Sequence, residues 1–255
     1  MATMPRDTSM VILGIESSPR RKHSHALFDS LSSVMLQGVL DVAAEYEGVA
    51  TERINLSACR LFPCRGCFSD METRCHFLCD CHDDDFRWIA GRVMAADAVI
   101  VATPTYMAGM SGVLKLFFER WISFKAPPAD TRKASKSLDE CFDLLKQMAA
   151  GQVETSNPLQ GKIGAVAVAG SEIGQASTAR EIMHIMNSYG FILPPQCFIY
   201  HTGHSMQSLE DVRACFYENR WLQMATENLA RSMVQLIRAT QHLSWPQLKQ
   251  TVQKP

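Results

Sequence analysis

The amino-acid sequence predicts an α/β fold in which helices cover both faces of a parallel β-sheet. Short apolar runs rich in Val, Ile and Ala alternate with segments whose apolar residues recur at helical spacing. Parallel strands that are covered on both faces form continuous apolar runs of this kind. No internal repeat breaks the alternation, and 255 residues are enough for one large domain.

Five apolar runs are the predicted strands, and the second is the weakest. They occupy residues 10–16, 49–56, 97–104, 162–170 and 191–200. Helical patterns follow these runs at residues 25–46, 85–95, 110–124, 175–189 and 207–240. Strict alternation of strand and helix is typical of a doubly wound sheet, in which each helix connects two parallel strands.

We expect a single domain over residues 10–240, with flexible ends at 1–9 and 241–255. Two segments do not fit the alternation. Residues 57–84 form a cysteine-rich insert, and residues 125–160 form a polar insert bounded by proline and glycine. Long inserts of this kind commonly serve as lids or subunit contacts.

The charge and hydropathy of the chain argue against two classes of partner. Its 25 Lys and Arg residues nearly balance its 26 Asp and Glu residues, so we expect binding neither to nucleic acid nor to a membrane surface. No apolar run approaches the roughly 18 residues of a membrane span, and the first residues lack the apolar middle of a signal peptide. We therefore expect a cytoplasmic protein.

Ligands of open α/β sheets bind outside the carboxyl ends of the strands, where the strand order reverses. The loops at those ends are residues 16–25, 104–112 and 170–175. The first lacks both the G-x-G-x-x-G dinucleotide pattern and the Walker pattern. The kind of ligand must therefore be inferred from the remaining residues of the three loops.

The first loop is suited to a phosphate group. It carries hydroxyl groups at Ser17, Ser18 and Ser24. Arg20 adds a cation, and the loop leads into a predicted helix whose N–H groups and dipole favour an anion. An ordinary helical turn capped by Ser24 is the alternative interpretation.

The second loop is suited to a flat heteroaromatic ring. Pro104 and Tyr106 offer apolar and aromatic surface for the face of such a ring. The small residues Ala108, Gly109 and Ser111 follow, and they permit close backbone approach to the edge of the ring.

The third loop adds a second surface of the same kind. Gly170 and Gly174 flank a short turn, which again allows close backbone contact. A phosphate in the first loop and a ring between the second and third loops together describe a pocket for flavin mononucleotide (FMN).

Four motifs then follow one another in the order typical of one family. They read Ser17-Ser18-Pro19-Arg20 with Ser24-His25, Cys64-Arg65-Gly66-Cys67 through Asp84-Asp85-Phe86, Thr103-Pro104-Thr105-Tyr106 with Lys115 and Glu119-Arg120, and Ile173-Gly174-Gln175. Across residues 10–200 the chain resembles the flavodoxin-like NAD(P)H-dependent FMN reductases, and most of all their iron–sulfur flavoprotein branch.

This resemblance implies a flavodoxin-like three-layer sandwich with a five-stranded parallel sheet in the order 2-1-3-4-5. It also implies which residues contact FMN. Those at the phosphate are Ser18, Arg20, Ser24 and His25. Those along the ring are Pro104, Thr105, Tyr106, Met107, Ala108, Gly109, Gly170, Ser171 and Gly174.

The phosphate loop departs from the family pattern at its first position. Glu16 or Ser17 replaces the usual glycine. Because an acid beside a phosphate is unfavourable, we expect Glu16 to point away or to belong to the strand.

The cysteines are concentrated in one segment. Six of the nine fall within the insert, at Cys59, Cys64, Cys67, Cys75, Cys79 and Cys81. A disulfide scaffold would be short and would spread its cysteines along the chain, so this pattern favours metal, cluster or redox chemistry. Three acids at Asp83, Asp84 and Asp85 follow and open a predicted helix, where acids are favourable.

The resemblance implies a [4Fe–4S] cluster, with Cys64 and Cys67 as the first two ligands and Asp70 at the expected third position. We expect Cys75 and Cys79 to complete the ligand set, with Cys81 as the alternative. A tetrahedral zinc site that includes His76 or His82 is a second interpretation. A metal-free segment of thiols beside the flavin is a third.

The function predicted by these features is that of an FMN-dependent oxidoreductase. Hydride would pass from NAD(P)H to N5 of FMN, and electrons would pass to a small-molecule or protein acceptor. Because the cofactor carries this chemistry, we expect no catalytic side chain. A non-catalytic FMN electron-transfer protein and a cysteine-based redox or metal sensor are the alternatives. Flavin sites of this family are completed by a neighbouring subunit, which together with the polar insert predicts a homodimer or homotetramer.

Overall fold

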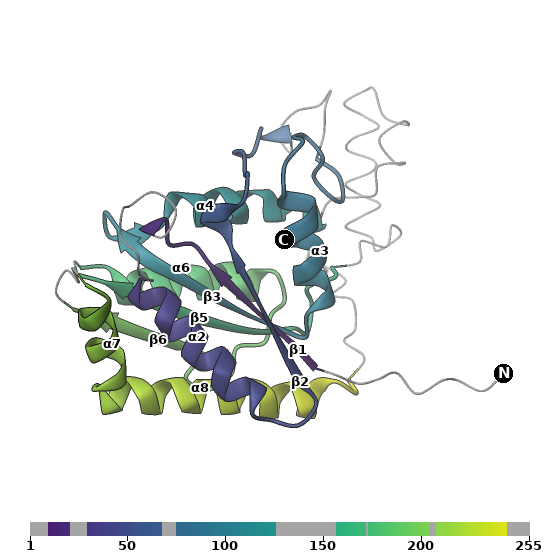
Figure 1. The fold of residues 1–255 in the computed structure, drawn as a ribbon. Coiled ribbons are helices and arrows are strands. Elements are labelled where there is room, and N and C mark those ends of the chain that lie inside the picture. Colours follow the sequence, from purple (N-terminus) through teal and green to yellow (C-terminus); the bar gives the residue numbers. More distant parts are fainter. Residues whose placement is uncertain are drawn as a thin grey trace, which may run out of the picture.

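The computed structural model of the chain describes residues 10–20, 30–67, 75–125, 157–171, 173–203 and 208–243 (Figure 1). Its centre is a six-stranded sheet. Five strands are parallel, in the order β2-β1-β3-β5-β6. Their bounds are Met10–Glu16 (β1), Val49–Asn55 (β2), Ala98–Tyr106 (β3), Ile163–Gly170 (β5) and Phe198–Thr202 (β6).

The predicted fold class and the relative order of the five parallel strands are confirmed, but the strand count differs. The sixth strand, β4 (Gly109–Met110), pairs antiparallel with the end of β3. It arises because the second loop folds back on its own strand as a hairpin.

Two layers of helices cover the sheet (Figure 1). One layer contains α2 (Leu31–Ala44), α7 (Leu209–Tyr217) and α8 (Arg220–Thr240). The other contains α3 (Phe86–Ala95), α4 (Gly112–Glu119) and α6 (Gln175–Ser188). Two 3₁₀ turns are η1 (Leu56–Ala58), after β2, and η3 (Arg120–Lys125), which continues α4. None of the described helices is long and apolar enough to cross a membrane.

Alternation along β5 explains how one strand serves both layers. Ala165 and Ala167 belong to the core under α2 and α8, whereas Val166 and Val168 belong to the core under α3, α4 and α6. Successive side chains of a strand point to opposite faces of the sheet. The small alanines leave room on one face for the larger residues of α2 and α8.

Two predicted elements are shorter than the sequence pattern suggested. The run at 191–200 forms a strand only from Phe198, because Pro194 and Pro195 interrupt it and Ile192 makes only an isolated bridge to Ile163. The helix predicted over 110–124 ends as α4 at Glu119 and continues as the 3₁₀ turn η3.

The pattern at 207–240 forms two helices rather than one. Ser208 and Asp211 form a capping box at the start of α7. The side chain of Asn219 accepts a hydrogen bond from the backbone N–H of Leu222 and so begins α8. The cap therefore separates two helices that share a single hydrophobic face.

Replacing Asn219 with Ala should lower the free energy of unfolding by about 1 kcal/mol, because it removes the acceptor for an N–H group at the start of α8. The free energy of unfolding is measured by urea denaturation, with circular dichroism as the signal. As a control, Glu227→Ala on the exposed face of α8 should change stability by less than about 0.5 kcal/mol. Equal stabilities of the two variants would show that the cap contributes nothing.

Candidate functional site

The first loop leaves β1 as a buried, hydrogen-bonded turn. The backbone N–H of Ser17 donates to the carbonyl of Ala102 at 3.0 Å, and its hydroxyl donates to the same oxygen at 3.2 Å. The hydroxyl of Ser18, also buried, accepts from the backbone N–H of Arg20 at 3.4 Å. Ser17 is thus committed to the sheet, and Ser18 and Arg20 lie at its carboxyl edge. The predicted phosphate contacts Ser24 and His25 lie outside the described residues.

Glu16 is the last residue of β1, as expected. Its side chain is almost fully buried and forms an ion pair with Arg53 of β2 at 2.5 Å. Arg53 also donates to the amide oxygen of Gln37 on α2 at 2.9 Å. The charge of Glu16, which stands where the family has glycine, is therefore neutralised within the fold.

The second loop is a tight hairpin with an unusual backbone. Met107 and Ala108 adopt positive φ angles of 50° and 61°, the left-handed region that residues with a side chain rarely enter. The hydroxyl of Thr103 holds the base of the hairpin by accepting from the backbone N–H of Ser111 at 3.2 Å. Such strain persists where the surrounding structure fixes it, which is common at ligand sites.

Two buried hydroxyls in this loop have no hydrogen-bond partner within the described part of the chain. They are Thr105 Oγ1 and Ser111 Oγ. A buried polar atom without a partner is costly, so these atoms fit a ligand that presents polar atoms along its edge. A flavin ring has such an edge, and the residues present therefore fit FMN.

The third loop packs directly on the second. A Cβ atom added at Gly170 would lie 1.8 Å from Thr105 Oγ1. A Cβ added at Gly174, whose φ is +106°, would lie 2.6 Å from the carbonyl oxygen of Ala108. Both positions therefore require glycine, because the two loops approach closer than any side chain would permit. Ser171 between them is exposed.

Arg20 of the first loop lies near Tyr106 of the second. Partial burial raises the pKa of the Tyr106 phenol, and the positive charge of Arg20 opposes part of that rise. The structure thus brings together the predicted phosphate loop and the predicted ring loop at the carboxyl ends of β1 and β3.

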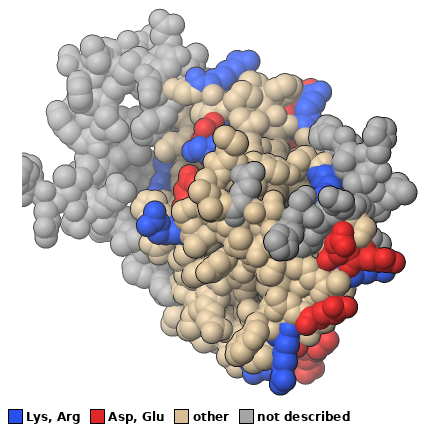
Figure 2. Space-filling model, turned by 90° about the vertical axis from the view of Figure 1, so that its left-hand side faces the viewer, with Lys and Arg blue, Asp and Glu red and all other residues tan. Residues whose placement is uncertain are grey.

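The face that surrounds these loops is largely uncharged (Figure 2). Exposed large apolar side chains occur here at Tyr106, Met107, Ile173 and Tyr200. Ile173 and Tyr200 line an open hollow of about 390 Å³ beside the start of α6. Gln175, Ser177 and Thr202 line it as well, so its wall is mixed in polarity.

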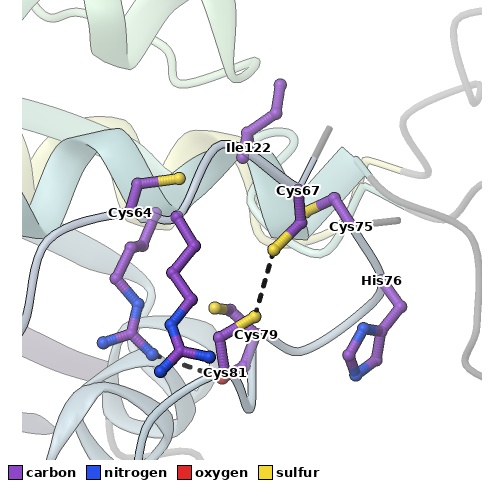
Figure 3. A pocket seen from close by; sticks show the side chains of 9 residues that line it. Cys64, Cys67, Cys75, His76, Cys79, Cys81 and Ile122 are labelled. Carbon is purple, nitrogen blue, oxygen red and sulfur yellow. Dashed lines mark hydrogen bonds between the residues drawn. The ribbon is translucent and has the colours of Figure 1, made fainter. Parts of the chain in front are cut away.

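The cysteine-rich insert forms a second candidate site. Five thiols line one pocket, at Cys64, Cys67, Cys75, Cys79 and Cys81 (Figure 3). The sulfur atoms of Cys67 and Cys81 are 3.4 Å apart. The sixth cysteine of the insert, Cys59, instead donates to the backbone carbonyl of Asn55 at 3.3 Å and does not line the pocket.

The two histidines considered as zinc ligands differ in position. His76 is buried and lines the pocket, whereas a ring nitrogen of His82 lies 3.0 Å from the carbonyl oxygen of Pro63. Among the described residues, no three His, Cys, Asp or Glu side chains are placed to share a single metal ion. The arrangement therefore offers sulfur ligands around a pocket rather than a tetrahedral centre.

Burial and mutual proximity raise the pKa of two of these thiols above the ordinary value for cysteine. Burial raises the pKa of Cys75 to about 11, and Cys79, Cys64 and Cys67 add to the rise. Burial likewise raises the pKa of Cys81 to about 12, followed in size by its hydrogen bond with Cys67. Any metal or cluster bound through these sulfurs must therefore displace protons.

Sequence reasoning missed one part of this site, the buried ion pair between Asp84 and Arg120. Their side chains are 0% and 1% exposed. Asp84 was predicted as a favourable acid near a helix start, and both Asp84 and Arg120 appeared within family motifs. The pair connects the insert to η3, and only the tertiary fold brings together residues that are 36 positions apart.

A family model described as NADPH-dependent FMN reductase matches residues 10–205. An iron–sulfur flavoprotein of Methanocaldococcus jannaschii is 31% identical over 112 residues, which are 44% of this chain and 51% of that protein. An iron–sulfur flavoprotein of Methanosarcina thermophila is 32% identical over 111 residues, covering 44% and 52%. The matched region thus spans about half the length of these relatives.

Solved structures support the fold. A structure of RosB, with the bound intermediate 8-demethyl-8-formylriboflavin-5'-phosphate, superposes with a TM-score of 0.60 at 14% identity, over 91% of this chain and 80% of that one. A structure described as a flavone reductase superposes with a TM-score of 0.53 at 16% identity, over 93% and 66%. Because the family model covers more than half of the sequence, the chain belongs to the NADPH-dependent FMN reductase family.

Proposed function

We propose that this protein is an FMN-dependent oxidoreductase that accepts hydride from NAD(P)H and delivers electrons to a small-molecule or protein acceptor. The observation that carries the proposal is the convergence of three loops at the carboxyl ends of β1, β3 and β5. Arg20 lies near Tyr106, and Gly174 contacts the backbone of Ala108. Family membership supplies the class of cofactor.

Ser18 and Arg20 would bind the FMN phosphate, together with Ser24 and His25. The cation of Arg20 and the hydroxyl groups suit a dianion at a helix start. The hairpin from Pro104 to Gly109 packs directly on the loop that carries Gly170, Ser171 and Gly174, so the ring would lie across the joint surface of the two loops rather than between them.

When bound, FMN supplies the redox chemistry, accepting hydride and releasing electrons. The chain's own residues would orient the ring and limit water around it. The uncharged surface formed by Met107, Ile173 and Tyr200 would place the planar ring of the hydride donor or acceptor beside the flavin loops.

The cysteine pocket supports a second element of the proposal, a [4Fe–4S] cluster. Cys64, Cys67, Cys75 and Cys79 would hold it, with Cys81 as the alternative to Cys79. The number and kind of ligands fit, and two buried nitrogen atoms at the pocket, on His76 and Arg120, have no partner within the described residues. The thiols lie against one another here, so cluster binding would require them to rotate apart.

These thiols also favour a second candidate function, a non-catalytic electron-transfer protein that carries FMN and a cluster. Anaerobic spectroscopy separates the two functions. Purified protein should show flavin absorption. NADH or NADPH should bleach this absorption at least as fast as the enzyme turns over, because the nicotinamide reduces an enzyme of this class directly. Bleaching by dithionite alone would favour the electron-transfer protein, and the absence of flavin binding would refute both.

The glycine contact predicts a specific loss of FMN affinity. Gly174→Ala should weaken FMN binding at least tenfold, because a Cβ at this position meets the backbone of Ala108 and the positive φ is strained. The dissociation constant is measured by quenching of flavin fluorescence. Gly112→Ala at the start of α4 is the matched control, since its Cβ meets no atom within 4 Å. Equal affinities of the two variants would place the flavin elsewhere.

The ligand assignment predicts separate losses of metal and flavin. Anaerobically reconstituted protein should hold about four irons per chain, as a [4Fe–4S] site requires. Cys67→Ala should abolish this iron while FMN content stays unchanged, as measured by iron, sulfide and flavin analysis. Cys59→Ala should leave both unchanged, because Cys59 does not line the pocket. Wild-type protein with neither iron nor zinc would identify the segment as a metal-free thiol cover.

A further inference from the structure

Arg120 is the most deeply placed cation in the described part of the cysteine pocket. Only 1% of its side chain is exposed, and its guanidinium lies 4.1 Å from the centroid of the Phe86 ring. One terminal nitrogen forms the ion pair with Asp84, and the other is 3.5 Å from the backbone oxygen of Cys79. The Phe86 ring on one face and these two contacts at the terminal nitrogens therefore fix the orientation of the guanidinium.

The remaining donor of Arg120 has no partner. Its Nε–H is buried, and no described residue accepts from it. A buried donor left without an acceptor costs about 1–3 kcal/mol, and more for a charged group. Arg120 lines the pocket together with five thiols (Figure 3). A group bound through these thiols would therefore offer sulfur atoms as acceptors for the Nε–H of Arg120.

A second buried nitrogen in the same pocket shows the same incompleteness. His76 Nε2 lies 2.8 Å from a carboxylate oxygen of Asp80, whereas His76 Nδ1 has no partner among the described residues. Both nitrogens belong to residues that line the pocket with the thiols. With Nε2–H donating to Asp80, Nδ1 of a neutral ring is an acceptor, so the Nε–H of Arg120 is the atom of the two that calls for an acceptor in the pocket.

We propose that Arg120 donates its Nε–H to a sulfur atom of the cluster and thereby raises its reduction potential, an inference that rests on the cluster element of the proposed function. Hydrogen bonds to cluster sulfurs and nearby positive charge both stabilise the reduced, more negative state. Asp84 sets the size of this effect, because its carboxylate cancels part of the charge of Arg120.

The position of Arg120 gives this tuning a functional consequence. Helix α4 begins at Gly112, directly after the flavin hairpin, and ends where Arg120 enters the pocket. A helix of 8 residues spans about 12 Å. A raised cluster potential therefore favours movement of electrons from the flavin end of α4 to the cysteine end.

The test is a redox titration of the full-length, anaerobically reconstituted protein, with the cluster and the flavin followed separately by electron paramagnetic resonance and absorbance. Arg120→Gln should lower the ratio of reduced to oxidised cluster about tenfold at a fixed potential, which is 59 mV for a one-electron couple. Arg120→Lys, which keeps the charge but lacks Nε–H, should lower it by less. The flavin potential should stay unchanged.

Asp84→Asn gives the opposite sign and distinguishes tuning from packing. It removes the negative charge that is paired with Arg120 and should therefore raise the ratio of reduced to oxidised cluster. Arg92→Gln removes the exposed partner of Glu52 on the far part of α3 and should change neither potential. Unchanged potentials in the Arg120 variants, shifts of equal sign in the Arg120 and Asp84 variants, or loss of iron from all of them would overturn the inference.

Absence of any cluster in the wild-type protein would also overturn it. That result would leave the proposed oxidoreductase intact, because reduction of bound FMN by NAD(P)H is measured independently. Conversely, protein that holds a tuned cluster but whose flavin is not reduced by NAD(P)H would refute the enzyme and retain the role of Arg120.

Discussion

Burial of β3 on both faces is the constraint that determines where chemistry can occur in this protein. Every residue of the strand from Ala98 to Thr105 is buried, and only Tyr106 at its end is exposed. A strand enclosed by two helix layers can present polar groups to a ligand only beyond its carboxyl end. Its neighbours β1 and β5 run parallel to it, so their terminal loops meet the same edge of the sheet.

The close approach of those loops strains the backbone locally, and the surrounding fold offsets that strain. Met107 and Ala108 adopt left-handed backbone angles, and Gly174 accepts the contact with Ala108 because it has no side chain. Thr103 fixes the base of the hairpin from within the buried strand. A strained hairpin held on a rigid strand gives a preformed surface, which reduces the ordering needed when a planar ligand binds.

The sequence was informative where a local pattern determines structure. Continuous apolar runs located the five parallel strands, and the glycines and small residues at strand ends located the loops. The β4 hairpin and the cap at Asn219 are local features that the strand and helix periodicities did not reveal, whereas the pair between Asp84 and Arg120 joins residues 36 positions apart and is set by the tertiary fold. The predicted contacts Ser24 and His25 lie outside the described residues, and the roles of the other predicted flavin and cluster contacts stay predictions.

The two candidate sites differ in how they treat charge, and α4 joins them. Around the flavin loops the surface is largely uncharged, and the acid at Glu16 is neutralised inside the sheet by Arg53 (Figure 2). At the other end of α4, Arg120 lines the pocket with five thiols; its charge is paired with Asp84, but its Nε–H has no partner in the described chain. An uncharged surface accommodates neutral planar rings, whereas a buried donor beside sulfur stabilises added negative charge.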